Sequence, residues 1–160
     1  PDWFAHLDVS AWRGKKATVR VDKLAEDSKA LDLVTQADTI WGVEQLYQEP
    51  LRGQLHFSSR RGWNNDPNGM VFADGEYHLY FQHNPYGWPW GNMHWGHLES
   101  ADLVHWEEKP IALYQRTTRD AAFSGGGFVD HADTAGLGKG TLFVAFTSTG
   151  RGEFSMSSGA

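Results

Sequence analysis

The amino-acid sequence predicts an all-β chain of short strands and tight turns, on three observations. The 160 residues include 18 Gly and 8 Trp, and many glycines beside many aromatic residues suit strands and turns better than a helical bundle. Two runs rich in strand-forming residues, 70–73 and 76–82, are joined by Asp74-Gly75, which is a strong hairpin signal. Further strand-like runs follow at 93–100 and 103–107. We therefore expect four antiparallel strands in one up-and-down sheet.

The first fifty residues carry weaker signals. The alternating run 17–21 predicts a short strand, which we interpret as the tail of a small β module. Apolar residues between Ser28 and Asp38 follow an approximately helical spacing with Ser28 as a candidate cap, so a short helix and an irregular linker are equally compatible. The stretch 50–53 (Pro-Leu-Arg-Gly) marks the expected boundary between a region at 1–50 and a region at 51–160.

The second region contains the predicted sheet and the beginning of another. We expect an entry strand over 54–59 ahead of the four-stranded sheet, and we expect the fourth strand of that sheet to end before Pro110. A single sheet of this kind cannot cover both of its faces, so it must stack on others. A β-propeller blade is one of the units that fit, and the runs 123–129 and 142–147 would then begin a second blade.

Composition excludes several classes of partner. The formal net charge is −6 and no cluster of Lys and Arg exceeds a local pair, which argues against a nucleic-acid partner. The chain has no Cys, so it contains no disulfide framework and no thiolate metal site. No apolar run approaches about 18 residues, so we expect no membrane-spanning segment. These observations leave the cellular compartment open.

The stretch 63–69 places one carboxylate, Asp66, between asparagines and a proline. Pro67 disfavours a helical backbone at Asp66, and Asn68-Gly69 tolerate the positive φ of a sharp turn. A carboxylate held in this way suits a group that must meet a substrate atom in one orientation. Taken alone, the motif is also typical of an Asx-type turn that only links two strands.

A second polar and aromatic stretch, 81–92, follows the hairpin. It contains Gln82 at the end of a predicted strand and Trp90 in a loop with Pro and Gly. Amides beside exposed indoles suit a neutral polyhydroxylated ligand, which needs hydrogen bonds at its edges and an apolar face to stack on. Trp90 fits packing and ligand binding equally well, whereas Trp95 and Trp106 lie on predicted strands and are expected in the core.

Two further patterns resemble known site types without meeting their requirements. His94 and His97 stand three apart on a predicted strand, so their side chains point to opposite faces and cannot bind one metal ion together. We therefore expect no metal site there. The run 123–127 lacks the Gly-Lys-Ser/Thr ending of a phosphate loop and precedes a strand rather than a helix.

Residues 54–113 resemble the N-terminal catalytic blade of glycoside hydrolase family 32, the β-fructosidases that include levanases, inulinases and invertases. Several ordered motifs at compatible spacing carry this resemblance, which extends over about 54–153. Residues 1–50 resemble the end of a β-sandwich-like module and linker found ahead of the propeller in some bacterial members. The matching stretches are Leu55-His56-Phe57, Trp63-Asn64-Asn65-Asp66-Pro67-Asn68-Gly69, Phe81-Gln82-His83-Asn84-Pro85, Trp90-Gly91-Asn92, His94-Trp95-Gly96-His97, Asp102-Leu103-Val104-His105-Trp106-Glu107 and Phe123-Ser124-Gly125.

The resemblance implies a five-bladed β-propeller, of which this chain would hold about the first blade and a half. It implies retaining hydrolysis of terminal β-fructofuranosides in sucrose, levan or inulin, with a sugar as partner, no metal and no organic cofactor. Asp66 would be the nucleophile, while the acid/base Glu and an acid in an Arg-Asp-Pro motif would follow Ala160. A secreted or periplasmic location is favoured by the resemblance alone. The fructosyl group would be bound by Asn65, Gln82, Trp90, Phe123 and Ser124, with Trp63 as support.

The sequence departs from the usual family spelling at three positions. Asn64 replaces Met and Gly53 replaces Pro at framing positions, while Gly126 replaces a second Ser near the rim of the expected pocket. Other functions fit the same residues: a non-catalytic sugar-binding propeller, a fructosyltransferase, and a related propeller glycosidase acting on arabinose polymers. The residues present do not specify which fructan linkage is cleaved.

Overall fold

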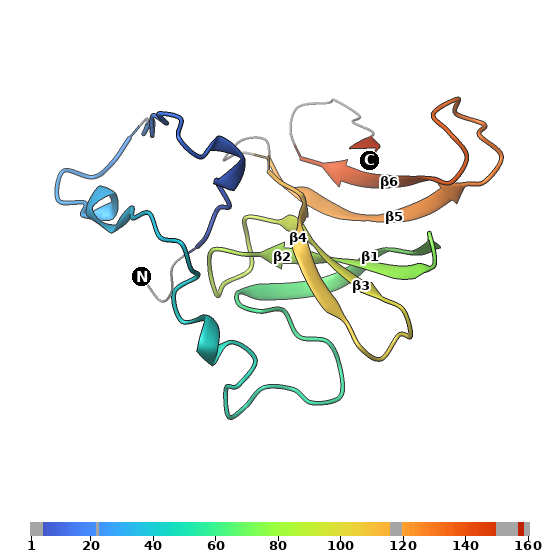
Figure 1. Ribbon diagram of the computed structural model, residues 1–160, viewed down its shortest axis with the longest axis horizontal. Helices are drawn as coiled ribbons and strands as arrows, with labels where there is room; N and C mark the ends of the chain where they lie inside the picture. Colours follow the sequence, from blue (N-terminus) through green and yellow to red (C-terminus); the bar gives the residue numbers. More distant parts are fainter. Residues whose placement is uncertain (1–4, 22, 116–119, 150–156, 159–160) are drawn as a thin grey trace. The chain divides into compact units, whose positions relative to one another are not determined.

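The computed structural model describes residues 5–21, 23–115, 120–149 and 157–158 (Figure 1). The chain divides into two compact units, Pro1–Glu49 and Pro50–Ala160. None of the helices in the described ranges is long and apolar enough to cross a membrane. The division falls beside the stretch 50–53, and the assignment of the first region to a β module stays a prediction.

The first unit consists of short helical turns and irregular chain. Its described residues form three 3-10 helices, η1 (Ser10–Trp12), η2 (Ala30–Leu33) and η3 (Val43–Gln45). η2 lies in the stretch predicted as helix or linker, and the Ser28 hydroxyl accepts a hydrogen bond from the Ala30 N–H at 3.3 Å. The prediction of a strand over 17–21 is wrong. A strand needs a second strand to pair with, and the described residues of the first unit contain no strand.

The second unit contains two antiparallel sheets, which Figure 1 shows stacked on each other. The predicted four-stranded up-and-down sheet is confirmed, as are the two strands predicted to begin a second sheet. The sheets contact each other mainly through their first strands, which is the arrangement of neighbouring propeller blades. In sheet order, the first contains β1 (Trp63–Ala73), β2 (Glu76–Asn84), β3 (His94–Ser100) and β4 (Glu107–Leu113), and the second contains β5 (Ala122–Asp130), β6 (Thr141–Ser148) and β7 (Ser157–Ser158).

The hairpin between β1 and β2 turns where the sequence predicts it. Asp74 and Gly75 have φ values of 51° and 89°, which match the type I′ turn that Asp-Gly favours. β1 starts earlier than expected and includes the whole stretch 63–69. The sharp turn predicted after Asn68-Gly69 is therefore wrong. Gly69 does adopt a positive φ of 48°, but it does so in a bulge, because β2 pairs with β1 on both sides of it.

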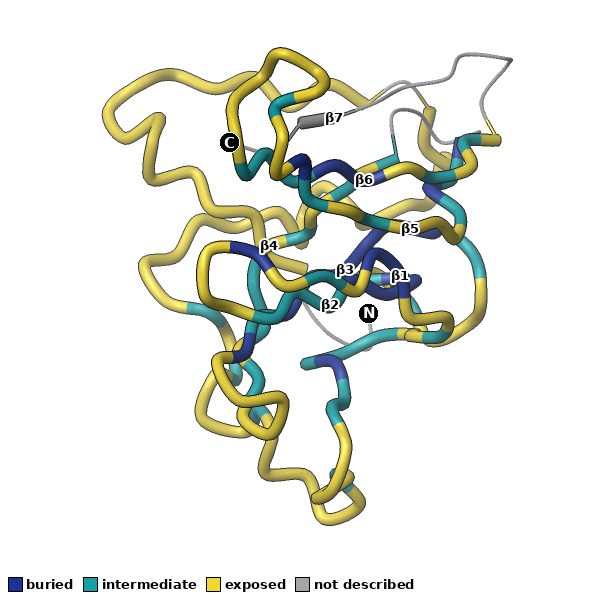
Figure 2. Tube along the Cα trace, turned by 90° about the vertical axis from the view of Figure 1, so that its right-hand side faces the viewer, coloured by how far each residue is buried: buried dark blue, intermediate teal, exposed yellow. Residues whose placement is uncertain are grey.

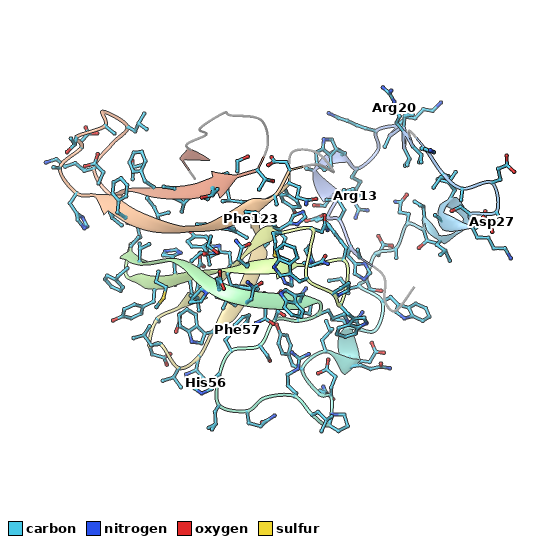
Figure 3. All side chains as sticks on the ribbon, turned by 180° about the vertical axis from the view of Figure 1, so that it is seen from behind. Arg13, Arg20, Asp27, His56, Phe57 and Phe123 are labelled. Carbon is cyan, nitrogen blue, oxygen red and sulfur yellow. The ribbon has the colours of Figure 1, made fainter. Side chains whose placement is uncertain are left out.

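The strand predicted over 54–59 is also wrong. This segment is irregular, and side-chain contacts to β2 and within the segment take the place of a strand ladder. The ring of Phe57, which is labelled in Figure 3, packs on the ring of Phe81 in β2 with centroids 5.0 Å apart. The Arg52 guanidinium donates hydrogen bonds to the carbonyl of Ser59 at 2.6 Å and to the carbonyl of Arg60 at 3.1 Å.

β4 begins at Glu107 rather than at Leu103, and it continues through Pro110. The delay has a local cause in the Asp102 carboxylate. Its Oδ1 accepts hydrogen bonds from the N–H groups of Val104 at 2.9 Å and His105 at 2.8 Å, which fixes a turn where the strand was expected. Pro110 is tolerated because β4 is the edge strand of the first sheet.

The core lies between the two sheets, and Figure 2 shows buried chain in dark blue in parts of β1, β2, β3 and β6. Trp95 is completely buried, as predicted, and its indole Nε1 donates a hydrogen bond to the Phe123 carbonyl at 3.1 Å. Trp106 is only half-buried and lies outside this core, so the prediction for Trp106 is wrong. The core consists of Tyr80, Trp95, Ala122 and Val144, with Leu113, Leu142 and Phe146 packed against them.

Two glycines allow β1 and β5 to approach closely. A Cβ placed on Gly127 of β5 would lie 2.9 Å from Val71 Cγ1 and 3.2 Å from the Cα of Gly69. Any larger residue at Gly127 would push the strands apart. The close contact between β1 and β5 at these glycines therefore also brings other side chains of the two strands near each other.

Candidate active site

Asp66 lies exposed on β1, in the first of the two bulges of that strand. Its Oδ2 accepts a hydrogen bond from the Ser124 hydroxyl of β5 at 2.7 Å, and its Oδ1 accepts one from Asn65 Nδ2 at 3.2 Å. The Ser124 hydrogen bond, followed by that of Asn65, holds the pKa of the Asp66 carboxyl below its ordinary value. Asp66 is therefore an ionised carboxylate at neutral pH and faces solvent.

A short chain of hydrogen bonds orients this carboxylate. The Trp63 indole Nε1 donates to Asn65 Oδ1 at 2.8 Å, which leaves the amide nitrogen of Asn65 directed at Asp66. Trp63 is itself anchored, because its carbonyl lies 2.7 Å from His83 Nδ1 in β2. Burial lowers the pKa of the His83 ring, which favours the neutral form. The stretch 63–66 thus contributes both the carboxylate and part of its support.

Ser124 reaches Asp66 because β5 also carries an irregularity at this point. The register of β5 with β6 shifts between Ala122 and Gly125, so Ser124 lies in a bulge that faces the bulge of β1. Bulges next to sites redirect a side chain that a regular strand would point elsewhere. A further link joins the two strands, since the Gly125 N–H donates to the buried Asn68 Oδ1 at 3.3 Å. Sequence reasoning missed Asn68, because it treated this residue as part of a turn.

An aromatic pair, Trp90 of the loop after β2 and the half-buried Phe123, lies at the start of β5. Trp90 is 59% exposed, and its ring centroid is 6.2 Å from that of Phe123. Phe123 immediately precedes Ser124 at the start of β5 (Figure 3). Together the two rings offer an apolar surface beside hydrogen-bonding groups, which suits the face of a sugar ring.

The loop that carries Trp90 is held by Asn84, which sequence reasoning also left out of the site. Asn84 is buried, and its Nδ2 donates to the Pro89 carbonyl at 3.0 Å. Its Oδ1 accepts hydrogen bonds from the Tyr86 N–H at 3.1 Å and from Asn92 Nδ2 at 3.3 Å. One side chain therefore connects three points of the loop. The Asn84-Pro85 pair within the family-like stretch was the signal that could have identified it.

Gln82 occupies a different position from the other predicted site residues. It is 3% exposed, and its Nε2 donates to the Ala122 carbonyl at 2.8 Å. The side chain therefore links β2 to the start of β5. A contact of Gln82 with sugar stays a prediction.

Known proteins resemble the second unit in sequence. The model of the glycosyl hydrolases family 32 N-terminal domain matches residues 56–157. The extracellular exo-inulinase of Aspergillus awamori is 50% identical over 97 residues, which are 58% of this chain and 18% of that protein. The levanase of Bacillus subtilis (strain 168) is 51% identical over 94 residues, which are 59% of this chain and 14% of that protein.

Solved structures share the fold. The crystal structure of exo-inulinase from Aspergillus awamori matches with a TM-score of 0.60 at 48% identity and covers 64% of this chain and 21% of that chain. The structure of fructofuranosidase from Schwanniomyces occidentalis complexed with fructose matches with a TM-score of 0.60 at 35% identity. The match covers 66% of this chain and 22% of that chain. This chain thus spans less than a quarter of the length of these relatives. Its match to the domain model extends over more than half of its residues, and the chain belongs to glycosyl hydrolases family 32.

Proposed function

We propose that the protein is a retaining glycoside hydrolase that releases fructose from sucrose or from the ends of fructans, with Asp66 as its nucleophile. The observation that carries this proposal is the exposed, ionised Asp66 carboxylate, held by Ser124 and Asn65 where β1 meets β5. Relatives named exo-inulinase, levanase and fructan beta-fructosidase support the substrate class.

The proposed mechanism has two displacements at the anomeric carbon. An Asp66 oxygen attacks that carbon and forms a fructosyl ester, while the leaving oxygen takes a proton from a second carboxyl group. In the second step the same group removes a proton from water, and the water oxygen attacks the anomeric carbon and releases Asp66. Retaining enzymes hold the two carboxyl groups about 5–5.5 Å apart. We expect the second group to be a Glu that follows residue 160 in the sequence.

The hydrogen bonds to Asp66 serve this mechanism in two ways. They keep the carboxylate deprotonated, as a nucleophile must be, and they restrict its rotation so that one oxygen can face the anomeric carbon. We assign fructosyl binding to Asn65, Gln82, Trp90, Phe123 and Ser124. Trp90 and Phe123 would contact the apolar face of the sugar, and the others would supply hydrogen bonds. The chemistry requires neither a metal nor an organic cofactor.

The test is the Asp66→Ala variant of the intact protein. Removing the nucleophile should lower hydrolysis of sucrose and fructans by several orders of magnitude. Added azide should restore part of the turnover and yield fructosyl azide of inverted configuration, because a small anion can enter the space left by the carboxylate. Glu76→Ala is the matched control, since Glu76 is an exposed acid on β2 at the hairpin.

Turnover of Asp66→Ala close to that of the parent would show that another group is the nucleophile. A parent protein that binds fructans without cleaving them would instead indicate the non-catalytic sugar-binding function.

A further inference from the structure

A second cluster of functional groups lies on the first sheet, away from Asp66. It comprises His78 of β2, His97 and Glu99 of β3, and Lys109 of β4, three neighbouring strands in Figure 1. The strand register brings them together, because His78 pairs with Glu99 and His97 pairs with Lys109. On β2, the position of His78 is several residues from those that pair around the Asp66 bulge. The cluster is therefore separate from the proposed catalytic site.

Three of these side chains direct one ligand atom each at a common point. His78 Nδ1 lies 3.1 Å from His97 Nε2 and 3.6 Å from Glu99 Oε1, and His97 Nε2 lies 3.7 Å from Glu99 Oε1. A triangle with these sides has a circumradius of about 2.0 Å, which is the distance at which Zn²⁺ binds nitrogen and carboxylate oxygen. A metal at its centre would need no rearrangement of the backbone.

Charge and burial also fit a cation. Glu99 Oε2, the oxygen turned away from the histidines, accepts a hydrogen bond from Lys109 Nζ at 2.9 Å, and Glu107 Oε2 is 3.0 Å from the same nitrogen. With neutral histidines, the carboxylates of Glu99 and Glu107 outweigh the single Lys109 ammonium, so the cluster together with Glu107 carries a net negative charge. The Lys109 contact fixes the orientation of Glu99, as hydrogen bonds to metal-bound carboxylates do. The side chains of His78 and His97 are each 15% exposed and that of Glu99 is 22% exposed, which leaves access for an ion.

We propose that His78, His97 and Glu99 form a binding site for a divalent transition-metal cation of the Zn²⁺ class. Two imidazoles and one carboxylate select such ions over Mg²⁺ and Ca²⁺, which prefer all-oxygen ligand sets. The ion replaces the hydrogen bond between the two rings, with the ring protons on His78 Nε2 and His97 Nδ1. Water supplies the fourth ligand. The bound ion links β2 to β3 and stabilises the first sheet rather than taking part in sugar cleavage.

The experiment is calorimetric titration of the intact, chelator-stripped protein with ZnCl₂. We expect one equivalent to bind, and we expect His78→Gln and His97→Gln each to weaken the affinity at least about tenfold. The matched control is His105→Gln, because the His105 ring is 88% exposed and contacts Asp102 rather than the cluster. Zinc should also raise the melting temperature of the parent and of His105→Gln, and it should have little effect on the two cluster variants.

The location can be tested without variants, in case a cluster substitution prevents folding. Crystals of the parent soaked in ZnCl₂ should show an anomalous peak between His78, His97 and Glu99. Absence of saturable binding, a peak at another position, or unchanged affinity in a folded His97→Gln variant would overturn the proposal.

Discussion

At the scale of single residues, the ionisation of Asp66 depends on a neighbour that is distant in the sequence. Ser124 donates the hydrogen bond that contributes most to the lowered pKa of the Asp66 carboxyl, and it does so across the junction of β1 and β5. A depressed pKa keeps the carboxylate ionised as the pH falls, until the pH reaches that pKa. Activity that needs the ionised form is therefore retained further into the acidic range than an ordinary Asp would allow.

Ser124→Ala should move the acidic limb of the pH–activity profile to higher pH. Without the hydroxyl, the pKa of Asp66 rises towards its ordinary value, so protonation removes the nucleophile at a higher pH. The measurement is kcat/KM for sucrose between about pH 3 and 8. Ser148→Ala is the matched control, because Ser148 donates to a different carboxylate, Asp120, at 2.8 Å. An acidic limb at the same pH in Ser124→Ala and in the parent would show that this hydrogen bond does not determine the pH dependence of catalysis.

Trp90→Ala should weaken sugar binding more than it weakens folding. The indole is 59% exposed in a loop whose conformation Asn84 holds independently, so its removal costs contact area with the ligand rather than with the core. We expect the KM to rise about tenfold, the effect of losing about 1.4 kcal/mol of binding free energy. Trp12→Ala, which removes an indole that is 55% exposed in the first unit, should change neither KM nor melting temperature. A large fall in melting temperature with an unchanged KM would show instead that Trp90 stabilises the fold.

The residue scale also shows what the sequence could and could not predict about the site. Asp66 could be found because Asn, Asp, Pro and Gly follow one another in a short motif. The pairing of Asp66 with Ser124 could not be deduced from spacing, since it depends on two facing bulges on strands of different sheets. Asn68 was missed for a related reason, because its hydrogen bond joins β1 to Gly125, which is distant in the sequence. Asn84 differs, since its contacts lie within its own loop and the Asn84-Pro85 pair could have identified it.

At the scale of elements, the sequence signals that involve only residues adjacent in the chain predicted the structure best. The hairpin at Asp74-Gly75 and the strand β3 follow from turn chemistry and strand-forming runs. The predicted start of β4 was wrong because the Asp102 side chain accepts hydrogen bonds from backbone N–H groups that a strand would otherwise use. The strand expected over 17–21 was wrong because an alternating pattern cannot supply its own partner.

Asp102→Ala should lower the melting temperature by a few degrees near neutral pH. The substitution removes the acceptor for the N–H groups of Val104 and His105 and frees the turn that leads into β4. Glu76→Ala should have no such effect. The measurement is the difference in melting temperature between parent and variant, and equal values would show that the turn forms without the carboxylate.

The difference in melting temperature between the parent and Asp102→Ala should become smaller as the pH falls. The hydrogen bonds from His105 are the main cause that lowers the pKa of the Asp102 carboxyl, so the folded state keeps this group ionised where the unfolded state protonates it. Its stabilising contribution is complete above the unfolded pKa of about 3.9 and declines as the pH falls below that value. Melting curves of the two proteins should therefore converge only at acidic pH.

At the scale of the whole molecule, the described part of the second unit is a complete four-stranded sheet with part of a second one beside it. β7 contributes two residues to the pairing along β6, so much of that edge has no partner strand among the described residues. Large apolar side chains of the first strand of each sheet are exposed, including Met70 at 69% and Phe128 at 58%. A propeller covers such faces and edges by adding further blades until the ring closes.

A polypeptide of residues 1–160 alone should therefore neither hydrolyse fructans nor remain monomeric. It contains the Asp66 carboxylate without the Glu that we expect after residue 160, and losing one member of an acid/base pair removes several orders of magnitude in rate. Among the described residues, the β6 edge is only partly paired and the apolar strand faces are exposed, and both favour association between copies. The test is to express residues 1–160 and the intact protein in parallel, and to measure fructose release from sucrose, inulin and levan together with size by gel filtration. A monomer of residues 1–160 that releases fructose at a rate close to that of the intact protein would contradict both the placement of the second carboxyl group and the need for closure by further blades.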